Sequence, residues 1–332
     1  MEQRFSFKVL TLFLFASFPL LTQAQMPRIT VQENEFVDDE GEVYVFRGYS
    51  SSDPDKLVKQ GSWNLAYFQE MKRWGANVIR FPVHPKAWRE RGKDNYLTLL
   101  DQGVEWAEAV DMYVIIDWHS IGNLVTEKFL RDIYETDLQE TFEFWRIISE
   151  RYGENSTVAL YELFNEPVRD PKFGLMKWER WKEILEQLIT EIRANGGKGI
   201  PLVAGFNWAY DLKPVENQPI EAAGIAYVSH PYPQKRKQPW PEKWTKDWGF
   251  VKEKYPVILT EIGYCREEDP GAHIPVISDH SYGKAISTYA DQNNISYIVW
   301  VFDKNWSPQL FTDDAYTPSY QGTFWKEKLK GY

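Results

Sequence analysis

Two stretches of this chain read as buried strands that each end in a glutamate. The first covers residues 158–167: it begins as an apolar, strand-like run and ends in Asn165 and Glu166, which a proline follows. Proline cannot donate to a β-ladder and biases the preceding residue away from the helical region, so the strand should stop there. The second, residues 257–263, delivers Glu261 in the same way. In parallel α/β folds the carboxyl ends of the strands meet at one edge, where chemistry usually sits.

A helix-then-strand alternation runs through the rest of the chain and predicts an α/β fold: a (β/α)8 TIM barrel with an N-terminal β-hairpin. The length of 332 residues suits one such barrel with a leader. Barrel strands are expected at residues 43–48, 76–82, 112–119, 158–167, 200–206, 224–229, 256–262 and 295–302. Helices are expected at residues 63–74, 97–110, 138–152, 178–194, 282–293 and 320–329.

The N-terminal hairpin is predicted over residues 29–48, where apolar and polar residues alternate. Its turn is expected at residues 38–41, and its second arm should continue into the first barrel strand. Ser62 is the candidate N-cap of the next helix. Residues 231–248, rich in Pro, Lys and Trp, are expected to form a long loop with room for a short helix. The composition does not break along the chain, so a single catalytic domain is expected over residues 25–332.

The first 24 residues have the pattern of a secretory signal peptide. Arg4 and Lys8 give a positive start, an apolar run covers residues 9–21, and residues 22–24 fit a small-residue cleavage site. The apolar run is short for a bilayer span, which favours a cleaved leader over a membrane anchor. We therefore expect residues 1–24 to be removed and the remaining protein to be secreted or periplasmic. We also expect a monomer.

Charge and aromatic content narrow the class of partner. The formal net charge is −10, and an acidic surface disfavours nucleic acid and anionic membranes. The aromatic fraction is 16 %, with 15 Trp, most of which should lie in the core. Exposed indoles, however, form flat apolar platforms that suit the faces of neutral sugar rings. Tryptophans that lie in loops beside polar residues include Trp208, Trp240, Trp244 and Trp306.

Polar and aromatic residues at the expected strand ends should converge on one mouth of the barrel. In chain order they are Arg80, His119, Asn165, Glu166, Trp208, His230, Tyr232, Glu261 and Trp300. Arg80 could instead be a structural ion pair, Trp300 could fill the barrel, and the two histidines could be hydrogen-bonded core residues. Because all of these residues are expected at one edge of the barrel, a catalytic site is favoured over separate structural roles. Two glutamates on different strands of one barrel are the pair that hydrolysis of a glycosidic bond needs.

Three stretches carry a family resemblance: Asn-Val-Ile-Arg-Phe-Pro at 77–82, Leu-Phe-Asn-Glu-Pro at 163–167, and Thr-Glu-Ile-Gly at 260–263. They resemble glycoside hydrolase family 5, the cellulase-type family of retaining barrel glycosidases. Asn-Glu-Pro is weakly specific by itself, but here it occurs in order with the second glutamate, His119, residues 230–232 and Trp300. The resemblance extends over residues 43–332.

The resemblance implies a role for the two glutamates and for the groups around them. Glu166 would be the acid/base that protonates the departing glycosidic oxygen and later deprotonates water. Glu261 would be the nucleophile of a retaining mechanism. Arg80 would hold Glu261 ionised, and Tyr232 would donate a hydrogen bond to it. Asn165 would bind the sugar 2-OH.

The remaining residues would contact the sugar chain. His230 would line the cleft near Glu166. On the non-reducing side of the cut, His119 and Trp300 would form a subsite, with Trp300 as the platform. Further platforms are expected at Trp208, Trp240 and Trp244.

The implied function is a secreted endo-β-1,4-glucanase that acts on a β-linked glucan or a related neutral polysaccharide. A β-mannanase or another β-glucan endohydrolase is the alternative within the family, and a non-catalytic carbohydrate-binding barrel is the alternative outside it. We expect no cofactor and no catalytic metal, because the five His lack ligand spacing. Cys265, the single cysteine, cannot form an internal disulfide and is expected to be a buried bystander.

Overall fold

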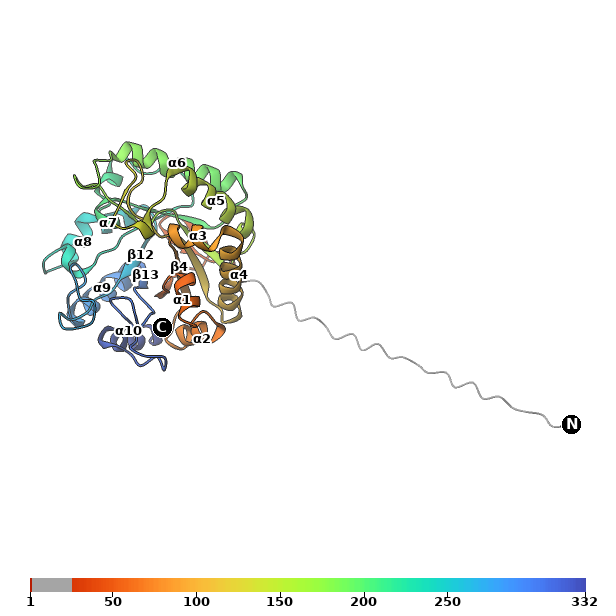
Figure 1. The fold of residues 1–332 in the computed structure, drawn as a ribbon. Coiled ribbons are helices and arrows are strands. Elements are labelled where there is room, and N and C mark those ends of the chain that lie inside the picture. The colour runs from red at the N-terminus through yellow and green to blue at the C-terminus, as the bar shows by residue number, and fades with distance from the viewer. Residues whose placement is uncertain (2–25) are drawn as a thin grey trace.

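The computed structural model describes Met1 and residues 26–332. In this part of the chain eight parallel strands close into a barrel with helices around it (Figure 1), so the predicted (β/α)8 fold is confirmed. In order around the barrel, the strands are β3 (Arg47–Ser50), β4 (Val78–Val83), β5 (Tyr113–Trp118), β8 (Val158–Glu162), β10 (Ile200–Ala204), β11 (Ala226–Val228), β12 (Val257–Ile262) and β13 (Ser296–Val299).

The helices alternate with these strands. Two of them, α5 (Leu138–Tyr152) and α6 (Trp178–Ala194), begin and end at the predicted residues. The other α-helices are α1 (Pro54–Lys59), α2 (Leu65–Arg73), α3 (Pro85–Arg91), α4 (Lys93–Ala109), α7 (Phe206–Ala209), α8 (Pro241–Asp247), α9 (His280–Gln292) and α10 (Tyr320–Lys330). Short 3-10 helices are η1 (Asp132–Tyr134), η2 (Lys213–Glu216), η3 (Pro233–Lys235) and η4 (Gly249–Glu253). A separate small sheet contains β6 (Ile121–Asn123), β7 (Lys128–Phe129) and β9 (Glu166–Pro167).

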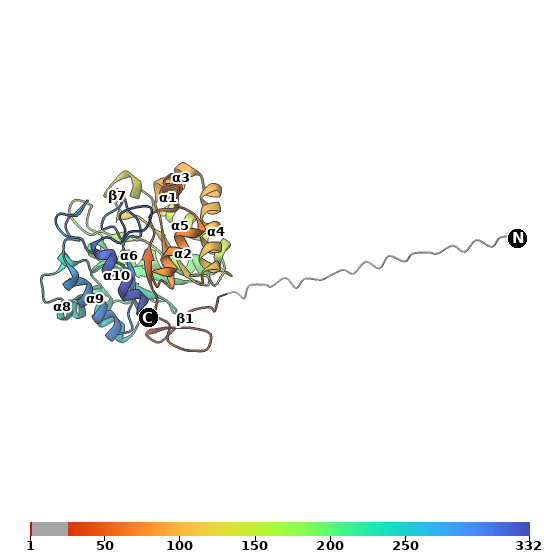
Figure 2. The same cartoon turned by 90° about the horizontal axis from the view of Figure 1, so that it is seen from below.

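Side chains alternate along each barrel strand between two apolar clusters, as strand geometry requires. In β4, for example, Val78 belongs to a cluster inside the barrel, and Ile79 belongs to the larger cluster between strands and helices. The inner cluster also takes in Ile29, Phe36 and Phe46 from the N-terminal segment. This segment therefore plugs one end of the barrel, and Figure 2 shows β1 at the end opposite α1, α3 and β7.

The hairpin exists, but its tight turn differs from the prediction. Strands β1 (Thr30–Gln32) and β2 (Glu35–Val37) pair antiparallel around Glu33, whose φ is 53°. The predicted turn at residues 38–41 is a second turn, closed by a bridge between Val37 and Val43. The side chain of Asp38 accepts backbone N–H bonds there and competes with a two-residue hairpin turn.

The predicted cap of the second helix is also corrected. α2 begins at Leu65, and its N-cap is Asn64, whose side-chain oxygen accepts from the N–H of Tyr67 at 3.2 Å. Ser62 lies two residues too early, because its own N–H donates to the carbonyl of Leu57 in the preceding turn.

The signal peptide predicted over residues 1–24 falls outside the described residues, apart from Met1. Across residues 26–332, each helix is too short or too polar to span a bilayer. Cys265 is buried, as expected.

The prediction that Trp240 and Trp244 are sugar platforms is wrong. Both belong to the main apolar core cluster, with exposed fractions of 6 % and 1 %, and their rings stack on each other with centroids 5.9 Å apart. Both rings meet Tyr282 of α9 edge-on. Residues 241–247 of the expected loop form the short helix α8, whose apolar side packs inward against α9, so these indoles belong to the core.

Trp244→Ala should lower the free energy of unfolding by about 3–5 kcal/mol, the usual cost of truncating a buried aromatic side chain. Urea unfolding at neutral pH measures this. Leu175→Ala is the control, because Leu175 is 71 % exposed and such a change should stay within about 0.5 kcal/mol. Equal losses for both variants would contradict the placement of Trp244 in the core.

Candidate active site

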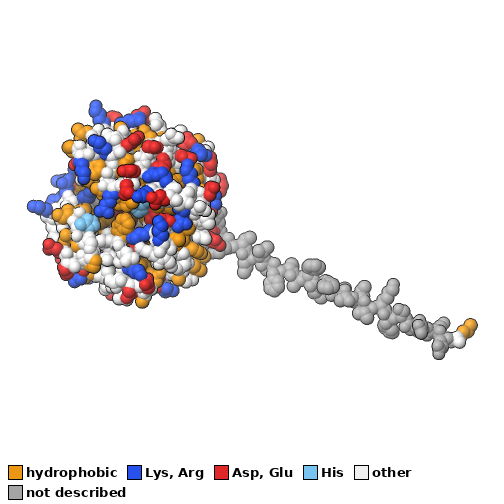
Figure 3. Space-filling model, in the orientation of Figure 1, with side chains coloured by type: hydrophobic (Ala, Val, Ile, Leu, Met, Phe, Trp, Pro, Cys, Tyr) orange, Lys and Arg blue, Asp and Glu red, His pale blue; other side chains and the backbone are white. Residues whose placement is uncertain are grey.

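The carboxyl ends of the barrel strands surround a cavity of about 700 Å³. Figure 3 presents this face, where apolar side chains gather near the middle with charged side chains around them. A mostly apolar hollow with a few polar groups is the usual form of a ligand site. Among the predicted residues, those that line it are His119, Glu166, Trp208, Tyr232, Glu261 and Trp300. Arg80, Asn165 and His230 are fully buried and make contact with this lining.

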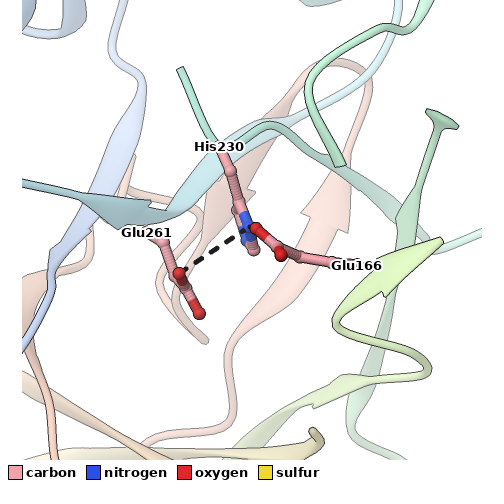
Figure 4. A group of neighbouring side chains, drawn as sticks. All are labelled: Glu166, His230 and Glu261. Carbon is pink, nitrogen blue, oxygen red and sulfur yellow. Dashed lines mark hydrogen bonds and ion pairs between the residues drawn. The ribbon is translucent and has the colours of Figure 1, made fainter. Parts of the chain in front are cut away.

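Two carboxylates face each other across the cavity floor. Glu166 lies in β9 beyond the end of β8, and Glu261 lies near the end of β12, where the pairing with β13 shifts register. Their exposed fractions are 8 % and 5 %. One oxygen of each carboxylate and a nitrogen of His230 lie within 4.8 Å of one another, and Figure 4 shows the three side chains converging from separate segments. A single substrate atom can therefore reach both carboxylates.

His230 contacts both Glu166 and Thr260. Its Nδ1 lies 3.0 Å from Oε1 of Glu166, and its Nε2 lies 2.8 Å from Oγ1 of Thr260. Thr260 donates its one hydroxyl proton to Glu162 at 2.8 Å, so it accepts from Nε2–H of His230. The contact between Nδ1 and Glu166 is therefore the one that changes when the ring gains or loses a proton.

Arg80 joins four side chains beneath the cavity. Its guanidinium lies 3.0 Å from Glu261, 2.7 Å from Glu162 and 2.9 Å from Asp117. It also donates to Oδ1 of Asn165 at 2.7 Å. A buried charge is tolerated when it is paired and hydrogen-bonded, and this arrangement meets that condition. The predicted contact between Arg80 and Glu261 is therefore present, within a larger network.

Sequence reasoning missed Asp117, Glu162 and Thr260 in this network. The signal was available, because both acids lie inside otherwise apolar strand runs, where an unpaired charge would be costly. Glu162 is also four residues before Glu166 on the same segment. Asp117 and Thr260 lie one and two positions inside their strands, and Glu162 ends β8 well before the predicted strand end.

Burial and charge pull the pKa values of these carboxyls in different directions. Burial tends to raise the pKa of Glu162, but the charge and hydrogen bonds of Arg80 and the nearby ring of His230 lower it overall. Burial raises the pKa of Asp117 well above its ordinary value, even beside Arg80. Burial also raises the pKa of Glu261, with His230 and Arg80 acting against it. Of the three carboxyls around Arg80, Glu162 is the one whose charged form is favoured.

Two further groups orient the carboxylates. Tyr232 donates its hydroxyl to Oε2 of Glu261 at 2.7 Å. With Oδ1 of Asn165 committed to Arg80, Nδ2 of Asn165 has no hydrogen-bond partner among the residues described. One buried amide donor of the residue that directly precedes Glu166 is therefore unused.

Aromatic rings form two walls on opposite sides of the pair. His119 and Trp300 stack in parallel, with centroids 5.4 Å apart and planes at 4°. Burial lowers the pKa of His119 well below its ordinary value, so this ring is neutral at pH 7. Trp306, half-buried, meets Trp300 edge-on. Trp208 is half-buried at the other wall.

The strand order explains why the walls oppose each other. In one direction around the barrel, β10 and β11 lie between β8 and β12; Trp208 follows β10 in the chain, and Lys235 follows β11. In the other direction, β5, β4, β3 and β13 lie between them; His119 directly follows β5, and Trp300 directly follows β13. The two glutamates therefore divide the mouth into two halves, and an extended ligand must cross between them.

Glu166, His230 and Glu261 could offer three ligand atoms to a cation. A metal needs an imidazole nitrogen with a free lone pair. Both nitrogens of His230 already face hydrogen-bond partners. Burial tends to lower the pKa of the ring, but Glu261, Glu162 and Glu166 together raise it to about 9, which favours the protonated ring over a metal ligand. The three residues therefore fit a hydrogen-bonded group better than a metal site.

Comparison with known proteins points to one family. Residues 37–305 match the family described as cellulase, glycosyl hydrolase family 5. A β-glucanase from Saccharophagus degradans, solved in its native form and in complex with cellotetraose, is 44 % identical to this chain with a TM-score of 0.91. That match covers 96 % of this chain and 98 % of the β-glucanase.

Curated relatives are more distant. Endoglucanase A from Butyrivibrio fibrisolvens is 27 % identical over 212 residues, which cover 62 % of this chain and 45 % of that protein. Endoglucanase Z from Dickeya dadantii is 26 % identical over 218 residues, which cover 65 % and 45 %. The chain thus spans less than half the length of these curated relatives.

The raised pKa of His230 predicts a pH dependence of stability. Its folded pKa is about 9, above the ordinary unfolded value of about 6.5. The stabilisation is therefore complete below about pH 6.5 and lost as pH rises through 9, with about 2 kcal/mol lost between pH 6.5 and 8. Urea unfolding at both pH values should show this fall in the wild type. In His230→Gln, which cannot titrate, that part of the fall should disappear; an unchanged fall would refute the assignment.

Proposed function

This chain belongs to glycosyl hydrolase family 5, and from that premise we propose that it is a secreted, retaining endo-β-1,4-glucanase. The observation that carries the proposal is the carboxylate pair, with oxygens of Glu166 and Glu261 within 4.8 Å of each other. Retaining glycosidases hold their carboxyl groups about 5–5.5 Å apart, whereas inverting ones leave about 6.5–9.5 Å for a water. The short spacing supports direct attack on the sugar by a carboxylate.

In the first step, Glu166 gives its proton to the glycosidic oxygen as the bond to C1 breaks. Glu261 attacks C1 from the opposite face and forms a covalent glycosyl-enzyme. Glu166 must begin this step protonated. Nδ1 of His230, 3.0 Å from Oε1 of Glu166, is placed to exchange a proton with this carboxyl.

In the second step, a water enters where the leaving sugar was. Glu166, now ionised, takes a proton from this water as the water attacks C1, and Glu261 leaves as a carboxylate. Two inversions give net retention. The negative charge that returns to Glu261 is stabilised by the hydroxyl of Tyr232 and by Arg80.

The remaining predicted residues position the sugar. Nδ2 of Asn165 donates to the 2-OH beside C1, a contact that strengthens as positive charge develops at C1. Trp300, held by its stack with His119, is the platform on the non-reducing side of the cut. Trp208 is the platform on the leaving-group side.

A β-linked glucan is the proposed substrate. The support is the similarity to a β-glucanase that has been solved with cellotetraose, together with a mostly apolar cavity between two aromatic walls. We propose one catalytic domain over residues 25–332, export to the outside or the periplasm after loss of residues 1–24, a monomeric state and no cofactor. The leader pattern of the sequence supports export.

A reducing-sugar assay on a panel of polysaccharides tests the substrate. The panel holds a soluble cellulose derivative, a mixed-linkage β-glucan, a β-mannan and a xylan. We expect the two glucans to be cut and their viscosity to fall early, as endo cleavage requires. Faster release from the β-mannan would favour the mannanase alternative.

The two glutamates should fail in different ways. In Glu166→Ala, turnover of glucans should fall about 10²–10⁴-fold, because the leaving sugar receives no proton. Formation of the glycosyl-enzyme from an aryl glycoside with an acidic phenol should stay fast, because that group leaves without a proton. Azide, a nucleophile that needs no base, should restore turnover and give a β-glycosyl azide. In Glu261→Ala, azide should replace the carboxylate and give the α-glycosyl azide.

Proton NMR of the azide products assigns the two roles. The opposite stereochemistry would exchange the acid/base and the nucleophile. An α-configured initial product from the wild-type enzyme would rule out retention.

Activity should be unchanged after incubation with excess EDTA and gel filtration, because two carboxyl groups suffice for this mechanism. Initial rates before and after treatment measure this. Loss of activity that a divalent ion restores would show that Glu166, His230 and Glu261 bind a metal after all.

A further inference from the structure

Lys235 occupies a position in the mouth that the proposed mechanism does not use. It ends η3, three residues after Tyr232, and it lines the same cavity as Glu166 and Glu261. Its Nζ donates to the backbone carbonyl of Asn207 at 2.9 Å and lies 4.9 Å from the ring centre of Trp208. The ammonium is therefore placed on the wall that β10 and β11 provide.

The α7 segment, whose Asn207 accepts the hydrogen bond from Lys235, has an unusual, non-helical backbone. Asn207, Trp208 and Ala209 have φ of 58°, 55° and 54°. The left-handed region costs a non-glycine residue about 1–2 kcal/mol, so three in a row persist only when their surroundings fix them. Two bonds to the segment after β11 do so: Nζ of Lys235 to Asn207, and the N–H of His230 to the carbonyl of Ala209. Lys235 thus helps to set the orientation of Trp208.

The charge of Lys235 is not balanced by a partner of its own. No carboxylate forms an ion pair with it within residues 26–332, and its hydrogen bond to Asn207 uses one of its three donors. Burial lowers the pKa of Lys235 to about 8, with Glu166 and Glu261 acting in the opposite sense. The group therefore stays mainly charged at pH 7, with N–H donors left for a ligand in the cavity.

We propose that Lys235 is a specificity-determining residue that donates a hydrogen bond to a hydroxyl of the sugar on the leaving-group side of the cut. Lys235 and Trp208 lie on one half of the mouth, and Trp300 and His119 on the other. Trp208 offers a face to the sugar ring, and the ammonium reaches the hydroxyl oxygens at its edge. A charged donor on this half-buried wall makes a stronger bond to a neutral hydroxyl than an uncharged donor would.

This role depends on the proposed double displacement, because that mechanism defines the leaving-group side. The bond to Lys235 would let the enzyme distinguish a sugar from an aryl group on the leaving-group side. A sugar gains the bond to Lys235, whereas an aryl group lacks the ring hydroxyls that accept it. Binding energy used at this subsite also holds the glycosidic oxygen next to Glu166.

The test compares two substrates in Lys235→Met, which keeps an apolar stem over Trp208 but removes the charge and the donors. With a cello-oligosaccharide, kcat/KM should fall about tenfold, as expected for loss of a charge-assisted hydrogen bond. With an aryl β-cellobioside it should change less than about twofold, because the glycone half is untouched. Lys235→Arg should recover part of the oligosaccharide activity. Lys237→Met is the control, since Lys237 is exposed and does not line the cavity, and both of its rates should match the wild type.

Equal losses on both substrates, or no loss on either, would overturn the role of Lys235. Equal losses would mean that Lys235 acts through the fold of the Asn207 loop. If Lys235→Met fails to fold, Lys235→Gln gives the same comparison with a neutral donor, and a loss specific to the oligosaccharide again supports the role. A wild-type enzyme that cuts neither substrate would instead reject the proposed function.

Discussion

The contacts of Arg80 are the constraint on which the rest of this site depends. One guanidinium on β4 holds Asp117 of β5, Glu162 of β8 and Glu261 of β12, all buried. Leaving such a partner unpaired in the interior typically costs about 3–5 kcal/mol. The four strands must therefore reach their final register together. The same network that links the barrel strands also orients Glu261, the proposed nucleophile, so stability and the geometry of the proposed site share the same side chains.

Strand ends could be predicted from the sequence because they leave a local signature. An apolar run that stops at a proline or glycine identifies Glu166 and Glu261 without knowledge of the fold. The partners of Arg80 leave no such signature, because pairing is decided when strands from distant parts of the chain become neighbours. Arg80 and Glu162 are 82 residues apart. A charged residue inside an apolar run indicates that a partner exists, but barrel closure decides which one.

The tryptophans show the limit of local patterns more sharply. Trp208 and Trp244 both lie in polar, loop-like sequence, yet the first lines the cavity and the second is buried against α9. The difference lies in the backbone: residues 241–247 form a helix with an inward side, while residues 207–209 turn left-handed at the mouth. The composition predicted aromatic platforms for sugar rings. Tertiary packing decides which indoles line the cavity.

The N-terminal segment limits the paths by which protons reach the buried charges of the barrel. Ile29, Phe36 and Phe46 seal the end of the barrel opposite the mouth with apolar surface, so the buried charges exchange with solvent from the mouth side. A ligand lying along the mouth would narrow that route, and departure of one half of the ligand would open it again. Proton exchange at the buried carboxyls is therefore tied to which half of the mouth is occupied.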